Sequence, residues 1–374
     1  MRKMPDGGGI DAIDGTSAAP AWRTVPPRIA PQAATSACVT LIGFEPAAIE
    51  YPGGLSRCSV RAVAGEQSCI VTQRKHAARA DLEAGVLREL RAGGAPVPAV
   101  LAFDGEWLIQ QDLGPRRLSA ALTDAQGRPA RDLIAQAAQG LLLCQRAAER
   151  CGLAQRVAPI GMAHDWLDRL IGTPRLVAQR LGLPDPAVGE VIRPAQLVPR
   201  HLAFVKWDAR PGNAVATDDG SVVWIDWEHC GARDALDDLA WLLCDEYMPD
   251  DPALEAALLS RFVPLFALQS KRSLEDAQVY LARFGALHTC MRLLLVLRHK
   301  GDGDWWDRRA CERTDRIGVT AEAALALCAR GARWSGRFPG GTRMSQFFSD
   351  AGKRLCTLTA DSANTARAES PALA

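Results

Sequence analysis

Short apolar runs separated by turns fill the first part of the chain. Residues 60–63 and 69–72 are rich in β-favouring side chains and are joined by a Gly-containing turn, which is typical of two paired strands. Residues 77–91 differ, because leucine and valine recur there at helical spacing and the pattern stops at a Gly-Gly pair. A second hairpin is predicted over 100–103 and 107–110, so this part reads as a small α+β unit.

The period of the pattern changes after Asp112-Leu113-Gly114-Pro115, which we interpret as a joint. Residues 131–150 carry one apolar face at helical spacing. We therefore expect residues 38–111 to form a small strand-rich lobe and residues 112–335 to form a larger, mainly helical lobe. Further helices are predicted at about 162–182, 235–247, 253–268, 274–299 and 318–331, interrupted by strands within 201–228.

The two ends of the chain have tail-like compositions. Residues 1–37 are rich in Pro, Ala and Gly, and residues 336–374 are rich in Ser, Thr and Ala towards their end. Such compositions favour extended or irregular chain. We expect a flexible N-terminal tail at 1–37 and a poorly ordered C-terminal tail at 336–374.

Composition excludes several classes of protein. With 374 residues, 48% of them hydrophobic, the chain can bury a substantial core. Its 44 Lys and Arg against 43 Asp and Glu give a net charge of +1, so no basic excess points to a nucleic-acid partner. Eleven scattered cysteines without a Cys-x-x-Cys pair favour a reducing cytoplasm. We see no signal peptide and no continuous apolar run of membrane-spanning length, and we expect a cytoplasmic protein without a membrane partner.

Two carboxylates and a carboxamide flank one predicted hairpin. Asp208 and Asn213 precede it, and Asp226 follows its second strand. The strands lie within 214–217 and 221–225, so the three side chains can meet at one end. Oxygen ligands gathered in this way suit a hard cation such as Mg²⁺ carrying phosphate, rather than zinc or copper. The alternative is local turn chemistry, because Asp and Asn often bind nearby backbone around a Pro-Gly pair.

The succession of motifs resembles the aminoglycoside phosphotransferase and choline kinase branch of small-molecule kinases. KWDARPGN at 206–213 stands where that family usually has His-x-Asp-x-x-x-x-Asn. The family element IDWExxGxxDxxxDLA is matched at 225–240. PGGLS, LEAGVLREL, GAPVPAVL and WLIQQDLG precede these motifs in the family order. The resemblance covers roughly residues 45–300 and implies a two-lobed, protein-kinase-like α+β fold.

The resemblance also implies a reaction. An ATP-dependent phosphotransferase of this kind moves the γ-phosphate to a hydroxyl of a small molecule with the help of Mg²⁺. Asp208 would orient the acceptor hydroxyl, and Asn213 and Asp226 would hold Mg²⁺. Asp238 would brace the catalytic loop. The acceptor stays open among an aminoglycoside, a choline-like amine, an amino acid and a sugar.

The nucleotide site is implied in the small lobe. Gly53 and Gly54 would cover the phosphates, although a plain Gly-Gly turn is the alternative. Gln111 lies in the joint, where backbone groups of the family contact the adenine edge. Glu83 would pair with a phosphate-binding cation of the neighbouring strand. That strand lacks a central lysine, so we assign the cation to Arg74, whose guanidinium can bind phosphate through two hydrogen bonds.

Two departures from the family pattern support a second hypothesis, a catalytically weak or inactive kinase-like module that binds a nucleotide for regulation. The first is the missing strand lysine near Arg74. The second is Lys206, where the family has histidine. Its ammonium would either pair with Asp208 or Asp226 or reach the phosphate, or it would point to solvent from a strand end. Glu228 is likewise open between a metal or substrate carboxylate and a solvated charge.

Overall fold

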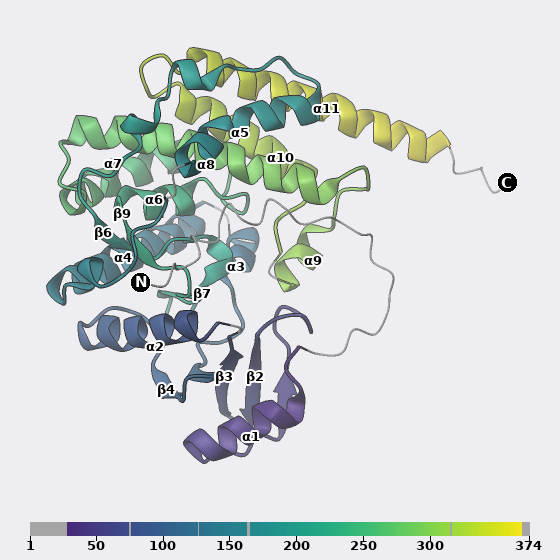
Figure 1. Cartoon of the computed structure of the whole chain (residues 1–374). Helices are drawn as coiled ribbons and strands as arrows, with labels where there is room; N and C mark the ends of the chain where they lie inside the picture. Colours follow the sequence, from purple (N-terminus) through teal and green to yellow (C-terminus); the bar gives the residue numbers. More distant parts are fainter. Residues whose placement is uncertain (1–27, 75, 126, 163–164, 315, 369–374) are drawn as a thin grey trace.

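The chain folds into a sheet-containing lobe and a larger helical lobe (Figure 1). The computed structural model describes residues 28–74, 76–125, 127–162, 165–314 and 316–368. The predicted two-lobed α+β architecture is confirmed, and the last strand of the sheet ends at Gln111.

A five-stranded antiparallel sheet is the main element of the smaller lobe. Its spatial order is β1-β2-β3-β5-β4. The expected pairing of 60–63 with 69–72 is confirmed, because β2 and β3 align Val60 with Val71 and Ala62 with Cys69. The strands are β1 (Ala48–Glu50), β2 (Ser59–Ala64), β3 (Gln67–Gln73), β4 (Val100–Phe103) and β5 (Trp107–Gln111).

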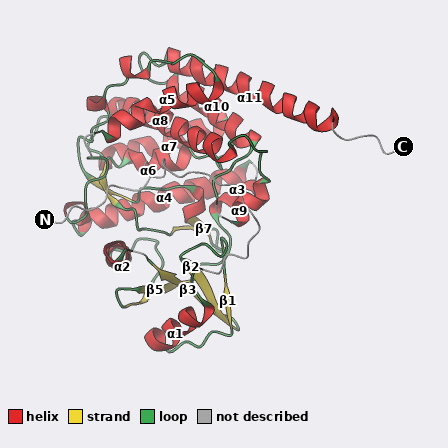
Figure 2. Cartoon of the chain, turned by 45° about the vertical axis from the view of Figure 1, so that its right-hand side comes forward, coloured by secondary structure: helices red, strands yellow, loops and turns green. Residues whose placement is uncertain are grey.

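Helix α1 (Pro31–Ile42) covers the outer face of this sheet (Figure 2). Its Ala34 and Cys38 are buried together with Val60 and Val71 of the strands. The expectation of a flexible tail through residue 37 is therefore wrong for residues 31–37, since buried apolar side chains hold this segment on the sheet. Residues 1–27 lie outside the described residues.

The second lobe is built from helices around one large apolar core. Every helix that periodicity predicted there is present, because each has an apolar face to bury. Helix α8 is long and apolar enough to cross a membrane, yet 89% of its most apolar window is buried inside the protein, as in a core helix. The helices are α3 (Leu118–Asp124), α4 (Arg128–Arg150), α5 (Trp166–Leu181), α6 (Leu236–Leu243), α7 (Pro252–Gln269), α8 (Leu274–Lys300), α9 (Arg308–Arg313) and α10 (Ala321–Ser335).

A last helix, α11 (Thr342–Ala368), shows that the expectation of a poorly ordered C-terminal tail is wrong for residues 342–368; residues 369–374 lie outside the described residues. Its first half packs on α10, and its second half extends beyond the body of the protein (Figures 1 and 2). The residues that bury it recur at helical spacing, so periodicity would have predicted the helix where composition did not. They are Met344, Phe347, Phe348, Ala351 and Leu355.

Two short strand pairs flank the motif at 206–213 and the start of the motif at 225–240. β6 (Ala203–Val205) pairs with β9 (Gly231–Arg233), and β7 (Ala214–Ala216) pairs with β8 (Val222–Trp224). The second pair is the predicted hairpin. The loop between β6 and β7 therefore lies beside the turn between β8 and β9. Helix α2 (Ala77–Ala92) follows β3 of the sheet and contacts α4 of the helical lobe.

Candidate active site

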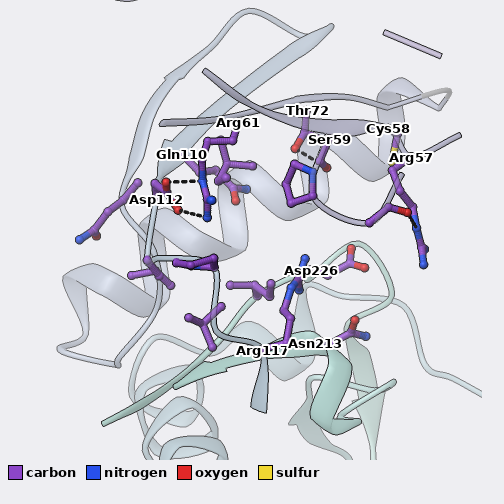
Figure 3. A pocket seen from close by; sticks show the side chains of 18 of the residues that line it. Arg57, Cys58, Ser59, Arg61, Thr72, Gln110, Asp112, Arg117, Asn213 and Asp226 are labelled. Carbon is purple, nitrogen blue, oxygen red and sulfur yellow. Dashed lines mark hydrogen bonds and ion pairs between the residues drawn. The ribbon is translucent and has the colours of Figure 1, made fainter. Parts of the chain in front are cut away.

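A cleft between the sheet and the β7–β8 hairpin contains most of the predicted functional residues (Figure 3). Ser59 and Thr72 of the sheet lie on its roof, and Asn213 and Asp226 lie on its floor. Six of the eight residues predicted for the site line it; Asp208 and Gly54 are not among its lining residues. The six are Gly53, Arg74, Glu83, Gln111, Asn213 and Asp226.

The backbone of the floor is unusual at three positions. Trp207, Asp208 and Asp226 have φ angles of 52°, 49° and 59°, in the left-handed region that side chains other than glycine seldom adopt. Such residues persist only when the surrounding structure holds them. Polar contacts hold both segments, the one with Trp207 and Asp208 and the one with Asp226.

Asp238 on α6 holds the loop that follows β6. Its carboxylate accepts hydrogen bonds from the backbone N–H groups of Lys206 and Trp207, both at 2.9 Å. The side chain of Gln145 donates a third, at 3.0 Å. Burial raises the pKa of Asp238 to about 6, although these donors act to lower it. This is the bracing contact that the resemblance implied for Asp238.

Asp208 and Asn213 are in direct contact. Asn213 Nδ2 donates to Asp208 Oδ2 at 2.7 Å and to the Asp208 carbonyl at 3.0 Å. Asn213 is 1% exposed, whereas the Asp208 side chain is 25% exposed. Arg210 Nε lies 3.6 Å from the other Asp208 oxygen, Oδ1. The carboxylate is thus fixed from one side and still reaches solvent.

Arg74 contacts carboxylates on both sides of the cleft. It donates to Glu83 Oε2 at 2.7 and 2.9 Å, which is the predicted pair. The same guanidinium also donates to Asp226 Oδ1 and to Glu228 Oε1, each at 2.7 Å. The sequence did not predict these two contacts. Glu228 is therefore turned into the cleft, and the alternative of a solvated strand-end charge is excluded.

The acids around Arg74 differ in their surroundings. Burial raises the pKa of Glu83, whose other oxygen accepts a hydrogen bond from the Trp227 N–H at 3.1 Å. Asp226 shows the opposite shift. Its partial burial raises the pKa, but the positive charges of Arg74 and Lys206 outweigh that effect and hold it below its usual range. Asp226 is consequently an anion at neutral pH.

Lys206 is buried, and the alternative of a lysine pointing to solvent is wrong. The residue is 1% exposed, and its Nζ donates to the Asp226 carbonyl oxygen at 2.9 Å. The ammonium also lies 5.7 Å from the ring centre of Trp224 and 5.5 Å from that of Trp227. Burial lowers the pKa of Lys206, while Asp208, Asp226 and Asp238 act to raise it.

The predicted metal ligands form a sparse set of oxygen donors. No cluster of three or more His, Cys, Asp or Glu side chains with metal-binding geometry occurs in the described part of the chain. Asn213 and Asp226 line the same cleft, and the Asp226 side chain is 35% exposed. Mg²⁺ usually takes only one or two protein carboxylates and completes its shell with phosphate oxygens and water. The donor set fits an ion that arrives with a nucleotide.

The Gly53-Gly54 turn lies at the mouth of the cleft. Both residues have left-handed backbones, with φ angles of 96° and 98°, so the turn requires glycine. Arg57 contacts the turn and the helical lobe at the same time. Its guanidinium donates to the Thr314 carbonyl beyond α9 at 2.7 Å and lies 3.4 Å from the Gly53 carbonyl. The Arg57 side chain therefore links the turn to the helical lobe.

The joint between the lobes is more polar than the sequence suggested. Asp112 accepts hydrogen bonds from Arg61 at 3.1 Å (Figure 3), from Ser68 at 2.7 Å and from the Gly114 N–H at 3.0 Å. Gln111 lines the cleft, and its side chain accepts a hydrogen bond from the Ala99 N–H at 3.3 Å. The Gln111 side chain is thus engaged with the joint itself.

A family model decides which class of protein has this arrangement. The model of the phosphotransferase enzyme family (APH) matches residues 48–274, more than half of the 374 residues. The chain belongs to the phosphotransferase enzyme family. The family that the sequence motifs resemble is therefore confirmed, and the match includes both the sheet and the floor of the cleft.

Solved structures share the fold of this phosphotransferase-family chain at low sequence identity. An aminoglycoside phosphotransferase from Alicyclobacillus acidocaldarius subsp. acidocaldarius is 11% identical, with 92% of this chain and 99% of that chain covered and a TM-score of 0.50. Amicoumacin kinase hAmiN, solved with AMP-PNP, Ca²⁺ and Ami, is 15% identical, with 77% and 94% covered and a TM-score of 0.50. A search of curated proteins found no match.

Three arginines of the cleft in this phosphotransferase-family chain were missed by the sequence analysis. Arg57 and Arg61 belong to the roof, and Arg117 donates to the Gly212 carbonyl in the floor at 2.9 Å. A signal existed for Arg61, because it follows Ser59 by two residues on β2 and such residues share a face. Arg57 and Arg117 lie in loops and had no periodic signal.

Proposed function

We propose that this chain transfers the γ-phosphate of ATP to a hydroxyl group of a small molecule. The observation that carries the proposal is the Asp208–Asn213 contact at 2.7 Å, on the same floor as Asp226. A phosphotransferase needs little covalent chemistry from the protein; it needs an oriented hydroxyl and positive charge near the moving phosphate. Asp208, held by Asn213, would meet the first requirement, and Arg74 would meet the second.

In the proposed reaction, Asp208 accepts the acceptor's hydroxyl proton as that O–H bond breaks. The acceptor oxygen forms its new bond to the γ-phosphorus, the bond from phosphorus to the β,γ-bridging oxygen breaks, and ADP leaves with that electron pair. Asn213 keeps Asp208 in one orientation. Mg²⁺, when bound with ATP, would be held by Asn213 and Asp226 and would offset negative charge on the phosphates.

The nucleotide would lie under the sheet. Gly53 and Gly54 would present backbone amides to the phosphates, and the backbone at Gln111 would face the base. Arg74 would donate to the phosphates while Glu83 holds its guanidinium. Because Arg74 also contacts Asp226 and Glu228, phosphate binding would require it to exchange at least one carboxylate for the ligand.

The Asp208→Asn variant tests the proposal. A panel of small hydroxyl compounds is screened for ADP release with Mg²⁺ and ATP, and the active compound is then used with each variant. We expect D208N to lose about 10²- to 10⁴-fold in rate, the range of a general base. The shift in melting temperature caused by Mg²⁺ and ATP should be retained, since Asp208 does not line the nucleotide cleft.

Asp219→Asn is the matched control, because Asp219 lies in the turn of the same hairpin and is exposed. D219N should turn over like the unaltered protein. Turnover by D208N at the unaltered rate would refute the proposed role of Asp208.

The second candidate is a catalytically weak or inactive module that binds a nucleotide for regulation. One observation favours it: Arg74 is already bound to three carboxylates, which reduces the positive charge available to phosphate. Stabilisation by Mg²⁺ and ATP, together with ADP release no faster than that of D208N for every compound, would support this candidate over the enzyme.

A further inference from the structure

Lys206 joins the two segments that carry the acidic residues of the floor. Its backbone N–H donates to Asp238 on α6, and its side-chain Nζ donates to the Asp226 carbonyl, both at 2.9 Å. The residue thus lies at the start of the loop that carries Asp208 and reaches the turn that carries Asp226. A single side chain links the two loops.

The surroundings of Lys206 show that the ammonium is held in place. Its stem runs through the core and its Nζ faces the rings of Trp224 and Trp227, which favour a cation electrostatically. Lysine is rarely buried without a partner, because removing its charge from water is costly. Here the Asp226 carbonyl is the hydrogen-bond acceptor, and Asp208, Asp226 and Asp238 provide compensating negative charge.

The Asp226 backbone needs such a contact. Its φ of 59° is left-handed, which aspartate tolerates better than most residues but which still requires support from its surroundings. The Arg74 contact holds only the Asp226 side chain. The Lys206 contact holds its main chain, through the carbonyl oxygen.

We propose that Lys206 is a positioning residue that fixes the Asp226 turn relative to the Asp208 loop. It does so through the hydrogen bond from its ammonium to the Asp226 carbonyl. The inference rests on the proposed function only for its effect on turnover. Lysine at this position, where the family pattern has histidine, is then a functional replacement and does not mark an inactive site.

Lys206→Met tests the proposal, because methionine keeps the length of the apolar stem and removes the donor. Hydrogen–deuterium exchange of peptides covering residues 225–230 reports on the Asp226 turn without any ligand. Melting temperature and the rate of ADP release with Mg²⁺, ATP and the acceptor found in the screen are measured on the same samples. K206H, which restores a side-chain donor, is the rescue variant.

Lys300→Met is the matched control. Lys300 Nζ also donates to a backbone carbonyl, that of Gly303 at 2.9 Å, and lies 5.2 Å from the ring centre of Trp305. It is half-buried and lies at the end of α8. K300M removes the same type of contact outside the cleft, so it should leave exchange at 225–230 and ADP release unchanged.

We expect K206M to melt below the unaltered protein, because the Asp226 carbonyl loses its donor and the neighbouring carboxylates lose a compensating charge. Exchange at 225–230 should rise about tenfold, the factor that one buried hydrogen bond is worth. The rate of ADP release should fall at least tenfold, mainly through kcat. K206H should partly reverse both the faster exchange and the slower ADP release.

Unchanged exchange at 225–230 in K206M would overturn the proposal, as would exchange that rises by the same factor over the whole protein. If K206M fails to fold, K206Q, which keeps a shorter polar side chain, takes the same measurements and the same criteria. If the exchange result holds but the unaltered protein releases no ADP with any compound, the proposed function fails and the positioning contact stands.

Discussion

Removing the Arg74 guanidinium should destabilise the protein through one particular acid, Glu83. In the Arg74→Met variant the three carboxylates that Arg74 contacts lose their shared cation. Asp226 and Glu228 have side chains that are 35% and 19% exposed, so water can compensate them. Glu83 is 1% exposed and keeps only the Trp227 N–H among its recorded donors. The penalty should therefore fall mainly on Glu83.

The size of the effect follows from the burial of the pair. Removing one partner of a buried ion pair typically costs about 3–5 kcal/mol, because the other charge is left uncompensated. At about 2.1 cal/mol/K per residue, a chain of 374 residues unfolds with an entropy of about 0.8 kcal/mol/K. We therefore expect R74M to lower the melting temperature by about 4–6 °C at pH 8.

The loss should depend on pH in a defined direction. Arg74 acts to lower the pKa of Glu83, which burial already raises, so its removal raises that pKa further. Glu83 in folded R74M then holds a proton at a pH where the unfolded chain has released it. The folded state is favoured at low pH and loses that advantage as pH rises. The difference between R74M and the unaltered protein should be smaller at pH 5 than at pH 8.

Melting curves followed by circular dichroism test this reasoning. The double variant R74M/E83Q removes the uncompensated charge, so it should recover a large part of the loss seen in R74M. Arg79→Met is the control, since Arg79 lies 3.9 Å from Glu228 and is 28% exposed; it should shift the melting temperature by no more than about 1 °C. A double variant no more stable than R74M at pH 8 would refute the argument.

Two further predictions concern stability. His288 is buried without a recorded partner for its Nε2, and burial, aided by Arg292 and opposed by Glu246, lowers its pKa from 6.5 to about 3. Between pH 6.5 and about 3, His288 is therefore protonated in the unfolded chain but not in the folded state. The free energy of unfolding falls as pH falls through this range. In urea titrations, H288L should therefore lose about 2 kcal/mol less unfolding free energy than the unaltered protein when pH is lowered to 5. If the unfolding free energies of the two proteins fell in parallel with pH, this prediction would be contradicted. Gly231 on β9 has no room for a methyl group, because its Cβ would lie 2.6 Å from Ile160 and 2.7 Å from a backbone carbonyl. G231A should cost about 1–3 kcal/mol, and an unchanged urea midpoint would show that β9 can shift.

Much of the fold followed from periodicity, because the helices and the β2–β3 and β7–β8 pairs each have a clear apolar pattern. The two ends were misjudged where composition was used in place of periodicity. Helix α1 is short and alanine-rich, and α11 carries its apolar residues within a polar, Ser- and Thr-containing segment. Composition averages over such faces and therefore hides them.

The candidate site was predictable only as far as motif spacing reached. Asp208, Asn213 and Asp226 follow from their positions around one hairpin, and Arg74 meets Glu83 as expected. The burial of Lys206 could not be predicted, because it depends on two tryptophans folding over the lysine. Contacts between distant loops carry no periodic signal in a single sequence.

The apolar interior of the protein is divided into two packing units. The outer core joins α1 to strands β2, β3 and β5, whereas Val86 and Leu87 of α2 belong to the large core of the helical lobe. The two packing units meet at the sheet, because Val100 of β4 packs against the larger core. Glu83 is anchored to the larger unit, and Arg74 stands at the end of β3, on the smaller one. Their ion pair consequently links the two packing units at the cleft.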